Sequence, residues 1–254
     1  MFSNIRYVLL TAMRDRLFLG LLVGILIAAY ISSVLGSTAM LEPEQMTLAF
    51  TAASARVIIM IGIIVFIGFH MRNAFDAKEI DVLLSRPISR TSLVISYWLG
   101  FSAVGICLVI PTIIMMYFVH VLSISGYMLW SLSLLLEALL VVTIALFASL
   151  TVKSGVSAVL ASLAMYTLAR MMGFFISTTK MGGLFETQQI NDASGLVMKG
   201  ISMVVPRLDF FAKSNWLIYG PKSYEDVWLV LLQAGVFIPL LLAAAVIDFK
   251  RKQF

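Results

Sequence analysis

The sequence predicts an all-α membrane protein with six transmembrane helices in a single domain, residues 1–254, and three observations support this fold class. First, 61% of the residues are hydrophobic and 12% are charged, whereas a soluble domain has about 25% charged residues. Second, six apolar runs are long enough to cross a bilayer as helices, which takes about 20 residues each. Third, the alternating pattern of β-barrel strands is absent, so each run must satisfy its backbone groups as a helix.

The first element in chain order is an expected helix over residues 1–16 that lies in the membrane interface. Phe2, Ile5 and Leu9 recur at helical spacing, and Arg14 and Arg16 make a polar break before the first span. The alternative is that these residues extend the first span into the lipid headgroups. No small-residue cleavage site follows them, so we expect the segment to be retained and not removed as a signal peptide.

Six spans are expected over residues 17–35, 49–69, 97–121, 128–150, 156–177 and 227–247. The first span carries a small residue at every fourth position, a pattern that permits close helix approach. This stripe fits either a seam at a dimer or pore, or packing against another helix of the same chain. Its members are Gly20, Gly24, Ala28, Ser32 and Gly36.

The basic residues predict the orientation of the chain in the membrane. Eleven of the 18 Lys and Arg residues lie on one side: before the first span, between the second and third, between the fourth and fifth, and after the sixth. The positive-inside rule places that side, and both termini, in the cytoplasm. We expect an integral protein of the bacterial inner membrane, and the net charge of +5 is explained by anionic lipid headgroups and requires no nucleic acid.

The segment 72–92 is the most charged connection between two spans. Residues 76–85 predict a short amphipathic helix, Pro87 disfavours its continuation, and Ser89 begins the helix that leads into the third span. Such an element suits a cytoplasmic coupling helix, although an ordinary solvated loop has the same composition. The expected contact residues for a partner are Asp76, Lys78, Glu79, Asp81, Leu83, Leu84, Arg86 and Arg90.

Two stretches resemble a known family. Residues 81–90 (DVLLSRPISR) look like the stretch that follows the second span in type-2, exporter-class ABC transporter permeases. Residues 206–211 (PRLDFF) look like the external stretch often seen before their last span. The order of six spans, an interfacial helix and a long external segment is also similar, so the resemblance covers the whole chain. One departure is that many relatives have a glycine ahead of Leu-Leu-Ser, where this chain reads AFDAK at 74–78.

The resemblance implies an ATP-driven transport subunit for a hydrophobic or amphipathic cargo. It implies a dimer with an identical or related permease chain, two cytoplasmic ABC ATPase subunits that bind ATP and Mg, and room for an accessory subunit. The chain itself lacks the phosphate-binding pattern G-x-x-x-x-G-K-[ST]. We therefore expect no ATPase site, no bound cofactor and no enzymatic activity in this chain.

Three charged residues fall inside the expected spans: Arg56, Glu137 and Arg170. A charge in the membrane is costly and usually has a partner, so we expect Glu137 to pair with Arg56 or with Arg170. Such a pair fits either contact with substrate or a structural link between helices.

The segment 178–226 between the fifth and sixth spans is too long for a plain turn, so we expect short external helices there. The resemblance implies a gate over the exit of the pathway, and a passive lid on the lipid surface is the alternative. The gate residues would be Pro206, Leu208, Asp209 and Phe210.

Three other functional classes compete with an ABC permease. An ion-coupled secondary transporter would need several intramembrane carboxylates and inverted repeats with broken helices, whereas the spans hold one such carboxylate and no obvious repeat. A membrane enzyme would need a nucleophile–base or metal constellation, which the sequence does not offer, so we expect no catalytic or metal-binding residues. A membrane assembly scaffold without transport activity is the remaining alternative.

Overall fold

The computed structural model describes residues 8, 10–12, 16–38, 42–80, 89–119, 122–180, 200, 205–221 and 224–251. Six long helices and two short ones occupy most of this part of the chain. All six long helices are apolar enough to cross a membrane, which confirms the six expected spans and gives the chain the architecture of an integral membrane protein. The elements are α2 (Arg16–Ser37), α3 (Pro43–Asp76), α5 (Arg90–Phe118), α6 (Ile124–Thr151), α7 (Gly155–Lys180), η1 (Leu208–Phe210), α9 (Asn215–Tyr219) and α10 (Tyr224–Arg251).

Local sequence signals set the starts of several helices. Pro43 begins α3, where its missing N–H leaves no hydrogen bond unmade. The Ser89 hydroxyl caps α5 by accepting a bond from the Ser92 N–H at 3.1 Å, as predicted. Ser123 caps α6 in the same way through the Gly126 N–H. In α10, acidic residues occupy the first turn and basic residues the last, which complements the helix dipole.

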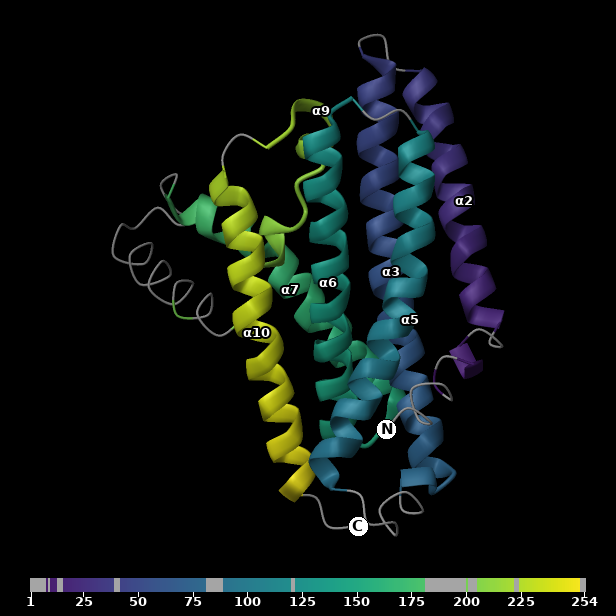
Figure 1. Cartoon of the computed structure of the whole chain (residues 1–254), viewed down its shortest axis with the longest axis vertical. Helices are drawn as coiled ribbons and strands as arrows, with labels where there is room; N and C mark the ends of the chain where they lie inside the picture. Colours follow the sequence, from purple (N-terminus) through teal and green to yellow (C-terminus); the bar gives the residue numbers. More distant parts are fainter. Residues whose placement is uncertain are drawn as a thin grey trace.

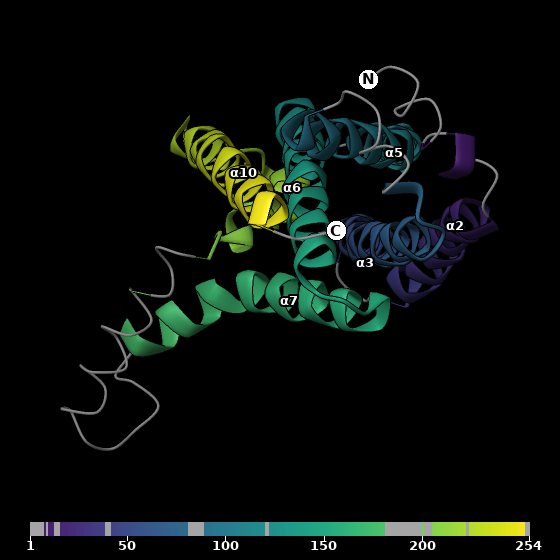
Figure 2. The ribbon, with the colours of Figure 1, turned by 90° about the horizontal axis from the view of Figure 1, so that it is seen from below.

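The bundle is organised around α6. This helix packs against α3, α5, α7, α9 and α10, and 72% of its apolar window is buried, against 17% for α2. Figure 2 looks along the bundle and shows α6 between α10 and α3, with α7 crossing one side. A charged group on the inner faces of these helices is therefore enclosed by protein on several sides.

The small-residue stripe of α2 faces α3 of the same chain. A Cβ added to Gly24 would contact Ile58 at 3.9 Å, and one added to Gly36 would clash with Thr47. At Gly24 and Gly36 the stripe therefore packs against another helix of the same chain, and does not form a seam at a dimer or pore. Gly20 lies beyond this contact, because a Cβ added there would have nothing within 4 Å.

One end of the bundle, which we call the basic end, gathers the end of α3, the start of α5, the α6–α7 connection and the end of α10 (Figure 1). Here α3 continues to Asp76, supported by an Arg72–Asp76 ion pair of 2.6 Å one turn apart. The chain then turns at Lys78, whose φ is 54°. The expected helix over 76–85 therefore does not begin at Asp76; Glu79 and Ile80 are helical after the turn, and residues 81–88 lie outside the described part.

Of the expected interfacial helix over 1–16, the structure describes residue 8, residues 10–12 and Arg16, all of them helical. Val8 and Ala12 are buried, and Val8 lies so close to Gly100 of α5 that an added Cβ would meet it at 3.0 Å. These residues pack on the bundle, while the others of this prediction lie outside the described residues.

Candidate functional site

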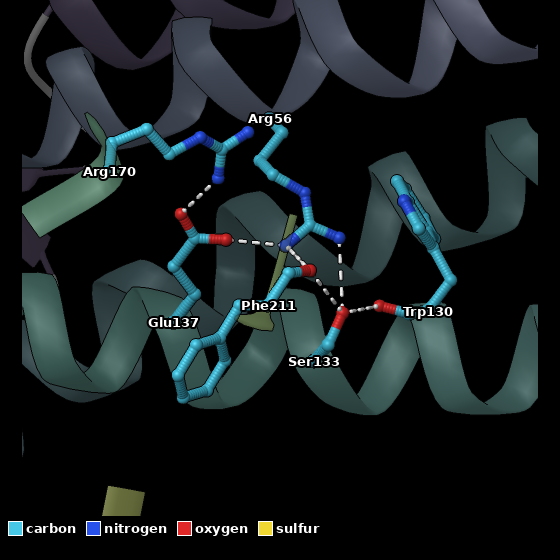
Figure 3. A network of polar contacts seen from close by, with 6 residues as sticks. All are labelled: Arg56, Trp130, Ser133, Glu137, Arg170 and Phe211. Atoms are coloured by element: carbon cyan, nitrogen blue, oxygen red, sulfur yellow. Dashed lines mark hydrogen bonds and ion pairs between the residues drawn. The ribbon is translucent and has the colours of Figure 1, made fainter. Parts of the chain in front are cut away.

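A network of charged and polar groups lies in the middle of the bundle, and we call it the charged network (Figure 3). Its ions are Arg56 on α3, Glu137 on α6 and Arg170 on α7. Arg56 and Glu137 each lie about three and a half turns from the start of their helix, and Arg170 lies about three turns before the end of α7. Three different helices thus bring these side chains to the same depth.

Glu137 joins the two arginines. Its Oε2 accepts from Nη1 of Arg56, and its Oε1 accepts from Nη1 of Arg170 at 2.9 Å. Both ion pairs that the sequence suggested are therefore present at once, with one carboxylate shared between two guanidinium groups. The side chains of Arg56 and Glu137 are 2% and 0% exposed, whereas that of Arg170 is 23% exposed.

Arg56 makes three hydrogen bonds among the described residues. Nη1 also donates to the carbonyl oxygen of Phe211 at 2.8 Å, and Nη2 donates to the Ser133 hydroxyl at 3.1 Å. The guanidinium lies 5.2 Å from the centre of the Trp130 ring, a distance at which the ring face attracts a cation. A buried charge is tolerated when it is paired and hydrogen-bonded, so Arg56 has the surroundings of a structural residue.

Arg170 differs from Arg56 in this respect. A guanidinium has five N–H donors, and among the described residues Arg170 makes one hydrogen bond, to Glu137. One turn away on the same helix, Tyr166 is 6% exposed, and its hydroxyl makes no hydrogen bond of ordinary length in the described part of the chain. The hydroxyl lies close enough to interact with the Glu137 carboxylate and with Arg170, so the unused donors at this edge of the charged network belong to Arg170.

The backbone partner of Arg56 comes from the connection between α7 and α10. Residues 205–211, which we call the inserted segment, lie between α10 and α6 (Figure 1) and end at Phe211, whose carbonyl oxygen accepts from Arg56. Leu208 and Phe211 are 0% exposed. Non-helical backbone at membrane depth requires such enclosure by protein. All four expected gate residues, Pro206, Leu208, Asp209 and Phe210, lie in this segment.

Polar contacts hold the inserted segment against two helices. Asp209 is bound by Arg207 through both carboxylate oxygens, at 3.3 and 2.7 Å, and the Arg207 guanidinium lies 4.0 Å from the centre of the Phe210 ring. The Arg207 N–H donates to Gln233 of α10 at 3.2 Å. On the other side Gly173 of α7 leaves room for Asp209, because an added Cβ would meet its Oδ2 at 2.5 Å.

Above the inserted segment, at the end of the bundle away from the basic end, lies an open hollow of about 560 Å³. Lys213 and Asp226 face it as an ion pair of 2.7 Å, and the Trp216 indole N–H also donates to Asp226 at 3.2 Å. Tyr219 is another lining residue. The inserted segment therefore lies between the charged network and a polar, aromatic opening.

At the basic end, two arginines join the segment 72–92 to other helices. Arg72 pairs with Asp76 and donates to the carbonyl oxygen of Lys153, in the connection between α6 and α7. Arg90 donates to the carbonyl oxygen of Lys250, at 3.1 Å, in the last turn of α10. The expected contact residues Asp76, Lys78, Glu79 and Arg90 lie at this end, whereas Asp81, Leu83, Leu84 and Arg86 lie outside the described residues.

Sequence reasoning identified the three ions but missed their neutral partners. Ser133 precedes Glu137 by four residues, and Tyr166 precedes Arg170 by four, so helical spacing placed each on the face of its ion. That signal was available. No sequence signal pointed to the Phe211 carbonyl as a partner, because every residue has a backbone carbonyl and the sequence does not single one out.

No known protein-family model matches the chain, and no curated protein matches it significantly. The function is therefore inferred from the charged network, the inserted segment and the basic end.

Proposed function

We propose that this chain is the permease subunit of a type-2, exporter-class ABC transporter, working with a separate cytoplasmic ATPase. The proposal combines six membrane-spanning helices with the resemblance of residues 81–90 and 206–211 to that family. A second permease chain completes the pathway, and two ATPase subunits bind ATP and Mg and drive transport. The basic end faces the cytoplasm, in accordance with the positive-inside rule.

One observation carries this proposal: the segment between α3 and α5 is fastened at both flanks to the ends of other helices. Arg72 connects it to the α6–α7 connection, and Arg90 connects it to the end of α10. A push on an unanchored loop would bend the loop alone. A push on this segment is passed to α3 and α5, to the α6–α7 connection and to α10, which is what a part moved by a separate ATPase requires.

The inserted segment supplies the second half of the mechanism. Its Phe211 carbonyl is hydrogen-bonded to Arg56 of α3, and its Asp209 rests against Gly173 of α7. Movement of α3 and α7 that is driven from the basic end therefore changes the position of this segment in the bundle. In this proposal the segment is the gate between the middle of the membrane and the outer opening.

Copurification is the direct test of the transport assignment. We expect the tagged full-length chain, extracted from its native membrane, to bring down an ATP-hydrolysing protein in comparable amount, and the complex to hydrolyse ATP. Purification without any nucleotide-hydrolysing protein would favour a secondary transporter or an assembly scaffold.

Charge reversal at the basic end tests the mechanism within that complex. We expect Glu79→Lys, Asp81→Lys and Arg90→Glu to reduce stimulation of the ATPase by the permease at least severalfold, because they reverse charges in the proposed contact. Glu44→Lys, which reverses an exposed acid in the first turn of α3 at the opposite end, is the matched control. Full stimulation in all three variants would exclude this segment as the coupling element.

A further inference from the structure

The charged network does not balance its own charge. Arg56 and Arg170 contribute two positive charges and Glu137 one negative charge, so the network carries a net charge of +1 in the middle of the membrane. Nearby, Arg207 and Asp209 form an ion pair and add no net charge. An uncompensated charge at this depth is expensive, and such residues usually face a substrate pathway.

The excess charge is located on Arg170. Arg56 is enclosed and has partners on both terminal nitrogens, whereas Arg170 is 23% exposed and makes a single hydrogen bond among the described residues. The buried Tyr166 hydroxyl beside it makes no hydrogen bond of ordinary length there, although it interacts with Glu137. A guanidinium edge with free donors, next to a hydroxyl that can turn from Glu137 to a ligand, is suited to the oxygens of a phosphate, sulfate or carboxylate group.

A second copy of this chain offers no obvious counter-charge. In the described ranges, every acid other than Glu137 lies within two turns of a helix end, at the turns beyond those ends, or in the inserted segment, where Asp209 is occupied by Arg207. Within the described residues no acid is therefore placed to balance this charge, and an anionic ligand would do so. On the same face of α7, one turn beyond Arg170, Phe174 is 60% exposed, and its neighbour Met171 is 43% exposed, so the surface next to the charge is apolar.

We propose that Arg170 and Tyr166 form the seat of an anionic headgroup, and that the apolar face of α7 beside them receives the apolar body of the same molecule. The cargo of the proposed permease is then an anionic amphiphile. This second statement rests on the proposed transport function. Binding at the seat depends only on the side chains of α7 and the charged network.

Binding can be measured on the full-length chain in nanodiscs of phosphatidylcholine, without any ATPase. The probe is dodecyl phosphate, with partitioning into empty nanodiscs subtracted. We expect saturable binding that weakens about tenfold or more in Arg170→Gln and roughly threefold to tenfold in Tyr166→Phe, as expected for a charged and a neutral hydrogen bond. Lys250→Gln removes one positive charge from an exposed residue at the basic end and should leave binding unchanged.

Two comparison ligands separate the sources of binding. Dodecyltrimethylammonium has the same tail with the opposite charge, and inorganic phosphate has the headgroup without a tail; both should bind at least tenfold more weakly than dodecyl phosphate. Equal binding of the cation, or dodecyl phosphate binding that is unchanged in both α7 variants, would overturn the seat. Equal binding of inorganic phosphate would overturn the amphiphile and leave a site for free anions.

The variants keep this test decisive. Tyr166→Phe retains the buried ring and removes the hydroxyl alone, so it reports on binding even if Arg170→Gln fails to fold. Failure of the proposed function gives a different result: a chain without an ATPase partner that still binds dodecyl phosphate refutes the ABC transporter assignment and leaves the anion seat in place.

Discussion

At the scale of single residues, Glu137 is the group on which the middle of the bundle depends. Its two carboxylate oxygens bind guanidinium groups from two other helices, so one side chain links α3, α6 and α7. A buried ion pair adds little net stability, but removing one partner is strongly destabilising because the other charge stays behind without compensation. Here the loss of one acid would leave two such charges.

We therefore expect Glu137→Ala to lower the free energy of unfolding by about 3–5 kcal/mol, measured by denaturation with dodecyl sulfate in mixed micelles. Glu44→Ala, at an exposed acid in the first turn of α3, should change it by less than about 1 kcal/mol.

In a double-mutant cycle, Glu137→Gln and Arg170→Gln should show a coupling of about 0.5–3 kcal/mol. Independent effects of the two substitutions would mean that the ion pair does not stabilise the protein.

At the scale of elements, the short helix α9 packs closely on α6 at a position where α6 has no side chain, Gly126. A Cβ at Gly126 would lie 1.7 Å from the carbonyl oxygen of Trp216, a separation that no side chain tolerates. Gly220, with φ 74°, ends α9 in a conformation that favours glycine. Helix α9 therefore depends on glycine at two defined positions.

Gly126→Ala should displace α9, since the atom that it would meet belongs to the backbone. We expect the free energy of unfolding to fall by about 1–3 kcal/mol, with faster proteolysis in the region of residues 205–221. Gly235→Ala on α10 is the matched control, because nothing lies within 4 Å of its added Cβ, and helix propensity favours alanine by about 1 kcal/mol or less. Equal stability of the two variants would show that α9 does not pack on Gly126 as described.

The six spans were predictable from the sequence because an apolar run of hydrocarbon length has one stable form in lipid. The Ser89 cap was predictable from the local sequence, and the pairing of Glu137 with Arg56 or Arg170 was predictable because a charge inside the membrane needs a partner. The depth of the inserted segment was not, because it depends on long-range contacts such as Arg56 with the Phe211 carbonyl. The start of the expected helix at Asp76 was wrong because the pair with Arg72 continues α3 by one more turn.

At the scale of the whole molecule, the basic end and the hollow lined by Lys213 and Trp216 lie at opposite ends of the bundle. The proposed mechanism requires the basic end to face the cytoplasm. The single cysteine, Cys107, lies within α5 and is partly buried, so a Cys107→Ser background allows each end to be labelled separately.

We expect Ser125→Cys in this background to react with a membrane-impermeant maleimide in intact cells, because residue 125 is exposed at the end away from the basic end. Ala77→Cys, exposed at the turn after α3, should react only in inverted membrane vesicles. The opposite pattern would place the basic end outside the cell, where no ATP-hydrolysing subunit reaches it.

Helix α3 carries Arg72 near one terminus and Arg56 near its middle, about 24 Å apart along a single 34-residue rod without an internal proline. A displacement at either of these two positions is transmitted along the helix to the other. If nucleotide binding in the proposed complex shifts α3 and thereby changes the affinity of the mid-membrane seat, occupancy of the seat must change nucleotide affinity by the same factor, because thermodynamic linkage is reciprocal. The cargo would then act as an effector of the ATPase that drives its transport.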